Sequence, residues 1–77
     1  HISDGLIYSS NDKKIAVELE LMLKSKARLD KIISHYMTEF DLDEVWYFVA
    51  DKTIKNAVTK AAKGHDFIKI HEMDSYV

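Results

Sequence analysis

The chain has 77 residues, of which 47% are hydrophobic and 31% are charged, and its formal net charge is −2. This length predicts one domain with a thin core, and the acidic balance argues against nucleic-acid binding through an overall basic surface. The chain has no cysteine, which excludes disulfides and thiolate ligands, and no apolar run of about 18 residues, so we expect no membrane partner and a cytoplasmic location.

The first part of the chain predicts a β-hairpin. Residues 6–9 form a short apolar run that ends at a turn signal, Ser10-Asn11-Asp12. Along residues 14–21, apolar and polar side chains alternate with the period of two of a half-buried strand. The side chains that we expect to face the core are Ile15, Val17, Leu19 and Leu21, and those on the opposite, solvated face are Lys14, Ala16, Glu18 and Glu20.

A helix is predicted after the hairpin. Ser25 is a candidate N-cap, and apolar residues then recur at helical spacing over about four turns. These residues are Leu29, Ile32, Ile33, Tyr36, Met37 and Phe40.

Two strands and a second helix complete the predicted fold. Residues 45–50 are apolar without alternation, which is typical of a central strand covered on both faces. Asp51 or Thr53 is the candidate N-cap of the second helix, which stops at Gly64, and residues 67–71 form the last strand. The order ββαβαβ predicts an α/β fold with a mixed four-stranded sheet and two helices, in one domain spanning residues 1–77.

Three carboxylates are predicted to meet on the hairpin. Glu18 and Glu20 are two residues apart on a strand, so both side chains leave the same face, and Asp4 just precedes the partner strand. Such an oxygen-rich group suits Mg²⁺ or Mn²⁺. Lys24 could bring an ammonium group to a phosphate there, with Ser25 as a further donor. The alternative is that the two glutamates belong to the solvated face of an ordinary amphipathic strand.

The ordered set Ser3-Asp4-Gly5, residues 16–21 (AVELEL) and Lys24-Ser25 with Arg28 resembles the PD-(D/E)xK nuclease superfamily. Within it, the set is most similar to the replication-relaxation proteins of bacterial plasmids and mobile elements. The resemblance implies a restriction-endonuclease-like core and hydrolysis of a DNA phosphodiester with Mg²⁺ or Mn²⁺. It implies Asp4, Glu18 and Glu20 as metal and catalytic residues, with Lys24 as a displaced equivalent of the catalytic lysine.

The chain departs from the family pattern at three points. Ser3 replaces a proline, Glu20 stands where the common form has lysine, and the helix that usually precedes the first strand is missing. We therefore expect a truncated core from a longer protein with a DNA-binding segment upstream. Two alternatives stay open: a catalytically inactive module of nuclease fold that binds DNA or protein, and an oligomerising domain such as a homodimer.

Contact with DNA is expected near the carboxylates. The candidate residues are Lys24, Ser25, Lys26 and Arg28. His1 abuts the motif and is a further candidate for touching a phosphate, whereas ordinary surface roles are expected for His35, His65 and His71.

Overall fold

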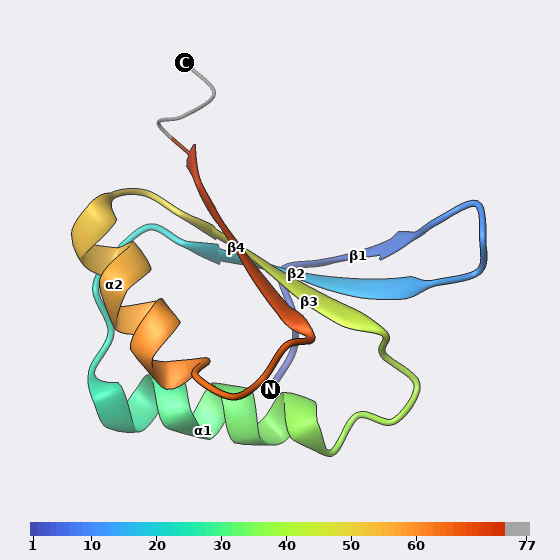
Figure 1. Cartoon of the computed structure of the whole chain (residues 1–77), viewed down its shortest axis with the longest axis horizontal. Coiled ribbons are helices and arrows are strands. Elements are labelled where there is room, and N and C mark those ends of the chain that lie inside the picture. Colours follow the sequence, from blue (N-terminus) through green and yellow to red (C-terminus); the bar gives the residue numbers. More distant parts are fainter. Residues whose placement is uncertain (74–77) are drawn as a thin grey trace.

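A computed structural model of the chain describes residues 1–73, which form a four-stranded sheet and two helices (Figure 1). The strands lie in the order β1-β2-β3-β4, with β1 antiparallel to β2 and the remaining pairs parallel. The elements are β1 (Gly5–Tyr8), β2 (Lys14–Glu20), α1 (Lys26–Met37), β3 (Glu44–Val49), α2 (Lys52–Ala61) and β4 (Ile68–Glu72). The predicted α/β class, element order and mixed sheet are confirmed.

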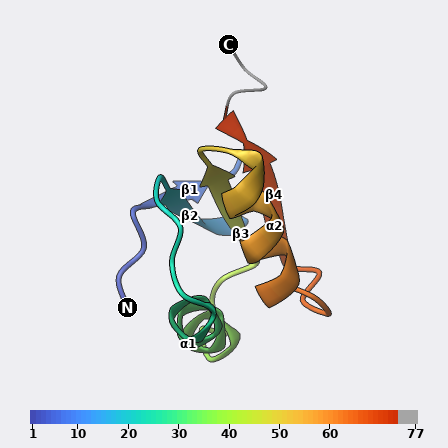
Figure 2. The same ribbon diagram turned by 90° about the vertical axis from the view of Figure 1, so that its left-hand side faces the viewer.

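Both helices cover the same face of the sheet (Figures 1 and 2). The chain steps from β2 to β3 to β4 in one direction across the sheet, and each step passes through a helix. Right-handed crossovers that step in the same direction put their helices on the same side. The sheet therefore has one covered face and one open face, and α1 and α2 also pack against each other.

The core lies between the helices and the covered face. Alternate residues of β3 are buried there, and α1 buries the apolar residues along one of its sides. The buried cluster consists of Ala16, Leu29, Ile32, Ile33, Tyr36, Val45, Tyr47, Val49, Ile54, Val58, Ala62 and Ile68.

The predicted orientation of β2 is wrong. Glu18 and Glu20 are only 3% and 1% exposed, whereas Leu19 is 47% exposed on the opposite face. The alternation correctly identifies two faces, but the two crossovers decide which of them the helices cover. Leu21, which was expected in the core, lies beyond the end of β2 and is also exposed.

The strand over residues 45–50 is central, as predicted, but it is covered on one face only. Val45, Tyr47 and Val49 are buried under the helices, while Trp46 and Phe48 are half-buried on the open face.

Local signals set the ends of both helices. The Oγ of Ser25 accepts from the backbone N–H of Arg28 (3.2 Å) and caps α1. Of the two candidates for the second cap, the residue used is Asp51, whose Oδ1 accepts from the N–H of Ile54 (2.9 Å). Gly64 follows α2 with a φ of +84°, a conformation that favours glycine.

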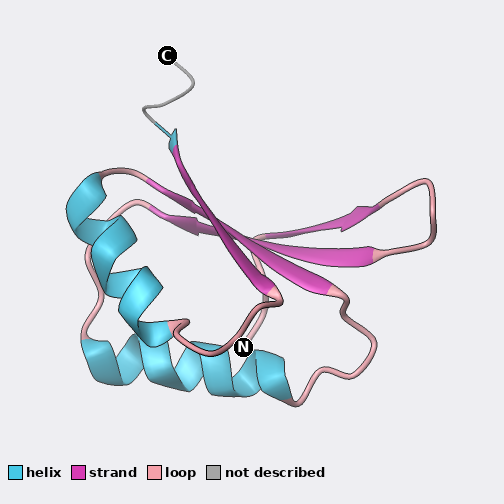
Figure 3. Ribbon diagram, viewed as in Figure 1, coloured by secondary structure: helices cyan, strands magenta, loops and turns pink. Residues whose placement is uncertain are grey.

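Helix α1 ends earlier than predicted. It stops at Met37, so Met37 is 52% exposed and Phe40, in the following turn, is 95% exposed. Figure 3 shows the hairpin of β1 and β2 extending beyond both helices. Neither helix in the described part of the chain is long and apolar enough to cross a membrane.

Candidate functional site

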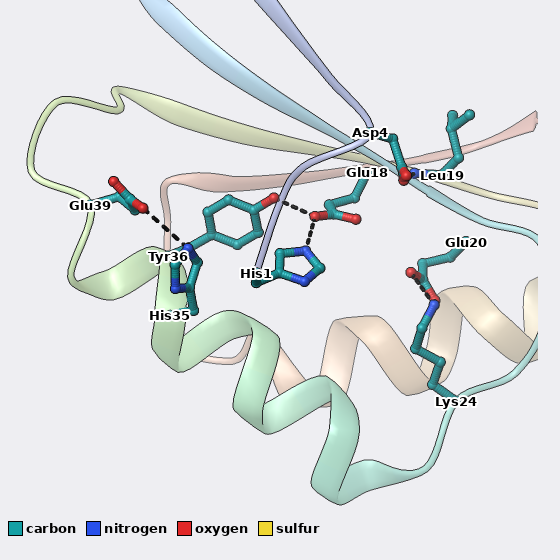
Figure 4. A network of polar contacts seen from close by, with 9 residues as sticks. All are labelled: His1, Asp4, Glu18, Leu19, Glu20, Lys24, His35, Tyr36 and Glu39. Carbon is teal, nitrogen blue, oxygen red and sulfur yellow. Dashed lines mark hydrogen bonds and ion pairs between the residues drawn. The ribbon is translucent and has the colours of Figure 1, made fainter.

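The hairpin register brings Asp4 to the carboxylate-bearing half of β2. Gly5 pairs with Val17, and the N–H of Asp4 donates to the carbonyl of Val17 (3.0 Å), so Asp4 stands across from Glu18. The Oδ2 of Asp4 accepts from the backbone N–H of Leu19 (2.7 Å). Asp4 therefore lies beside residues 18–20, as the hairpin geometry predicts (Figure 4).

Glu18 is a buried carboxyl with two polar partners. Its Oε1 accepts a hydrogen bond from the Tyr36 hydroxyl and lies 2.5 Å from Nε2 of His1 (Figure 4). Burial raises the pKa of Glu18 from its ordinary 4.5 to about 7. The Tyr36 hydrogen bond acts in the opposite direction, and the nearby carboxyls of Asp4 and Glu20 raise the pKa further.

Glu20 and Lys24 form a tight ion pair. The Nζ of Lys24 lies 2.6 Å from both carboxylate oxygens of Glu20, which is almost completely buried. Lys24 belongs to the loop before the Ser25 cap, so its side chain reaches back to the end of β2. The predicted approach of the Lys24 ammonium to the carboxylates is present in the structure, and its contact there is Glu20.

Two tyrosines were not identified as site residues from the sequence. The hydroxyl of Tyr36 bonds to Glu18, and Tyr47 pairs with Glu18 across β2 and β3. The Tyr47 side chain is fully buried, and in the described part of the chain its hydroxyl has no hydrogen-bond partner. Burial raises the pKa of Tyr47, and the charges of Glu18, Glu20 and Asp4 add to this. Both tyrosines fit an apolar pattern in the sequence, which gives no signal for the position of a hydroxyl.

The carboxylate cluster (Asp4, Glu18 and Glu20) has the donor chemistry for a hard divalent cation. Within residues 1–73, no group of three or more Asp, Glu or His side chains has the spacing of a formed metal site. Glu20 is engaged by Lys24, the Oδ2 of Asp4 accepts from the N–H of Leu19, and the Oε1 of Glu18 contacts Tyr36 and His1. Mg²⁺ commonly binds through one or two carboxylates and keeps several waters. Of the three carboxylates, Asp4 and Glu18 are the two that could hold such an ion, because Glu20 is already paired with Lys24.

The residues expected to contact DNA do not gather at one point. The Ser25 hydroxyl serves as the helix cap, and Lys26 is exposed and paired with Asp30 (2.7 Å). Arg28 lies on the exposed surface of α1. Of this set, only Lys24 has an ion pair or hydrogen bond to the carboxylate cluster among the residues that the structure describes.

Comparisons with known proteins give no match: no family model, no curated protein and no solved structure is significantly similar to the chain.

Proposed function

We propose that the chain is a restriction-endonuclease-like core that hydrolyses DNA phosphodiester bonds with Mg²⁺ or Mn²⁺, in the replication or relaxation of a plasmid or mobile element. The observation that supports the proposal is the position of Asp4 across from Glu18, next to a buried ion pair of Glu20 and Lys24. Like charges at close range are costly unless a cation neutralises them. Burial is the main cause of the raised pKa of Glu18, and the nearby carboxyls of Asp4 and Glu20 raise it further.

Each residue has a role in the proposed reaction. Asp4 and Glu18 would hold the ion, which supplies Lewis acidity and neutralises phosphate charge when bound. The Tyr36 hydroxyl fixes the orientation of the Glu18 carboxylate. Lys24 would stabilise the charge that develops on the phosphate oxygens, and Glu20 keeps its ammonium group at the site.

Plasmid nicking tests this proposal. The protein is incubated with supercoiled plasmid in Mn²⁺, in Mg²⁺ and in EDTA. We expect nicking that requires the divalent ion and that is lost in Glu18→Gln and Asp4→Asn. Glu44→Gln is the matched control, because Glu44 lies on the same sheet but outside the carboxylate cluster. Nicking that survives Glu18→Gln would eliminate the site assignment.

The second candidate function is a module of the same fold that binds DNA or protein without catalysis. The observation that favours it is that each carboxylate already has a partner: Leu19 N–H for Asp4, Tyr36 and His1 for Glu18, and Lys24 for Glu20. This candidate predicts that titration with Mg²⁺ leaves the NMR signals of Asp4, Glu18 and Glu20 unchanged. A clear shift at those three residues would count against it.

An oligomerising role is a further candidate, supported by the edge strand β1. Its Leu6, Ile7 and Tyr8 side chains are 49%, 38% and 69% exposed, and an unpaired strand edge can pair with a second copy. Sedimentation velocity at several protein concentrations distinguishes a homodimer from a monomer.

A further inference from the structure

Four basic side chains surround a hollow beside the carboxylate cluster. This basic hollow has a volume of about 290 Å³ and is lined by His1, Arg28, Lys31, Ile32 and His35. Arg28, Lys31 and His35 are three and four residues apart along α1, so they share one side of the helix. His1 comes from the opposite side, with its ring 5.8 Å from the ring of His35 in an edge-on arrangement.

Arg28 and Lys31 of the basic hollow have no acidic partner within residues 1–73, although the chain as a whole is acidic. Lys26, on the same helix, is by contrast paired with Asp30. Neighbouring like charges on a helix are destabilising by themselves. An anion placed between Arg28 and Lys31 would remove this repulsion.

The basic hollow is connected to the carboxylate cluster through His1. The Nε2 of His1 lies 2.5 Å from Oε1 of Glu18, while the other partner of that oxygen is Tyr36, the residue after His35. Figure 4 shows the His1 ring between the Glu18 carboxylate and α1. A ligand in the hollow would therefore lie next to one held at Asp4 and Glu18. A polymer with regularly spaced anionic groups is suited to occupy both positions.

We propose that the basic hollow binds a backbone phosphate of DNA adjacent to the one that is cleaved. The inference rests on the proposed function for the identity of the polymer. The Arg28 guanidinium can bind two phosphate oxygens at once, and the Lys31 ammonium supplies a second charge. His35 is held by Glu39 (3.1 Å) and forms a wall of the hollow with Ile32.

DNA binding measured without cleavage tests the inference. Fluorescence anisotropy of a short fluorescein-labelled duplex is recorded in EDTA over a range of salt concentrations. The test variant is Arg28→Gln/Lys31→Gln. The matched control is Lys52→Gln/Lys55→Gln, which removes two exposed charges at the same spacing from α2. A charge-preserving variant, Arg28→Lys/Lys31→Arg, and circular dichroism of each protein separate lost contacts from lost folding.

The expected result is specific to the test variant. Its affinity at low salt falls by roughly tenfold, and the slope of log K against log salt decreases by about one, as for one lost phosphate contact. The control keeps the parent affinity and slope, and the charge-preserving variant recovers most of the affinity. An unchanged test variant, an equal loss in the control, or a parent protein that does not bind the duplex would overturn the inference.

The same variants separate this inference from the proposed function. Duplex binding in EDTA and plasmid nicking with Mn²⁺ or Mg²⁺ are recorded separately for the parent and for the test variant. If binding depends on Arg28 and Lys31 but the parent does not nick with Mn²⁺ or Mg²⁺, the hollow is supported and the nuclease proposal fails. If the parent nicks but the test variant binds normally, the nuclease proposal stands and the hollow is refuted.

Discussion

Replacing Glu18 with glutamine is expected to make the protein more stable at alkaline pH. The Glu18 carboxyl is buried beside Asp4 and Glu20, so the folded state disfavours its ionised form. Glutamine has nearly the same shape, can still accept the hydrogen bond from Tyr36 and carries no charge. The substitution therefore removes an electrostatic cost and keeps the packing.

The magnitude follows from the pKa of Glu18, which rises from 4.5 to about 7 on folding. The difference, 7 − 4.5 = 2.5, corresponds to roughly 3 kcal/mol at about 1.4 kcal/mol for each pKa unit. Below pH 4.5 the group is protonated in both states and the cost is absent. As the pH rises from 4.5 to 7, the unfolded state loses its proton before the folded state does, so the parent loses stability over this range and the glutamine variant does not.

Thermal and urea unfolding of both proteins at pH 4.5 and pH 8, in EDTA, measures the effect. We expect nearly equal stabilities at pH 4.5. At pH 8 the variant should be more stable by roughly 3 kcal/mol, or about 10–20 °C in Tm for a domain of this size. Mg²⁺ added at pH 8 should raise the Tm of the parent and leave that of the variant unchanged.

Glu44→Gln provides a control of opposite sign. The hydrogen bond from Trp46 and the neighbouring Lys13 lower the pKa of Glu44, so its loss should slightly destabilise the protein at pH 8. The reasoning about Glu18 would be refuted by a glutamine variant with the same stability difference from the parent at both pH values, or by one less stable at pH 8.

Three other substitutions test separate parts of the structure. Lys24→Met leaves the buried carboxylate of Glu20 unpaired and should lower the free energy of unfolding in urea by about 2–3 kcal/mol. This loss is smaller than for a fully buried ion pair because Lys24 is partly exposed. Lys24→Arg should retain most of the stability. Asp51→Ala removes the cap that binds the N–H of Ile54 and should cost about 1 kcal/mol; an unchanged Tm would show that α2 does not depend on this cap. Gly64→Ala places a Cβ on a residue whose φ is +84°, so it should destabilise the protein by about 1 kcal/mol even though the space around that Cβ is open. An unchanged midpoint of urea unfolding would contradict the assigned backbone conformation.

The sequence predicts the local features of the site well. An antiparallel hairpin fixes which residues face each other, so the position of Asp4 relative to Glu18 follows from the turn at Asn11. The caps at Ser25 and Asp51 can be predicted from sequence because each side-chain oxygen accepts a hydrogen bond from the backbone N–H three residues later.

The features that were mispredicted or missed depend on tertiary arrangement. Alternation along β2 is symmetric between the two faces, and only the direction of both crossovers determines that Glu18 and Glu20 lie under the helices. Spacing correctly places Tyr36 in the core, but its polar end meets Glu18 only because α1 crosses beneath that part of β2.

The burial of Glu18 and Glu20 also determines how β2 is held in the sheet. At the covered positions of this strand only Ala16 adds an apolar side chain to the core, so its anchoring there relies on main-chain hydrogen bonds to β1 and β3. In a domain with a small hydrophobic core, a cation coordinated by Asp4 and Glu18 would cross-link the first two strands in addition to its role in catalysis. Amide hydrogen exchange in β1 and β2 should therefore slow when Mg²⁺ is present, while exchange in β4 should change little.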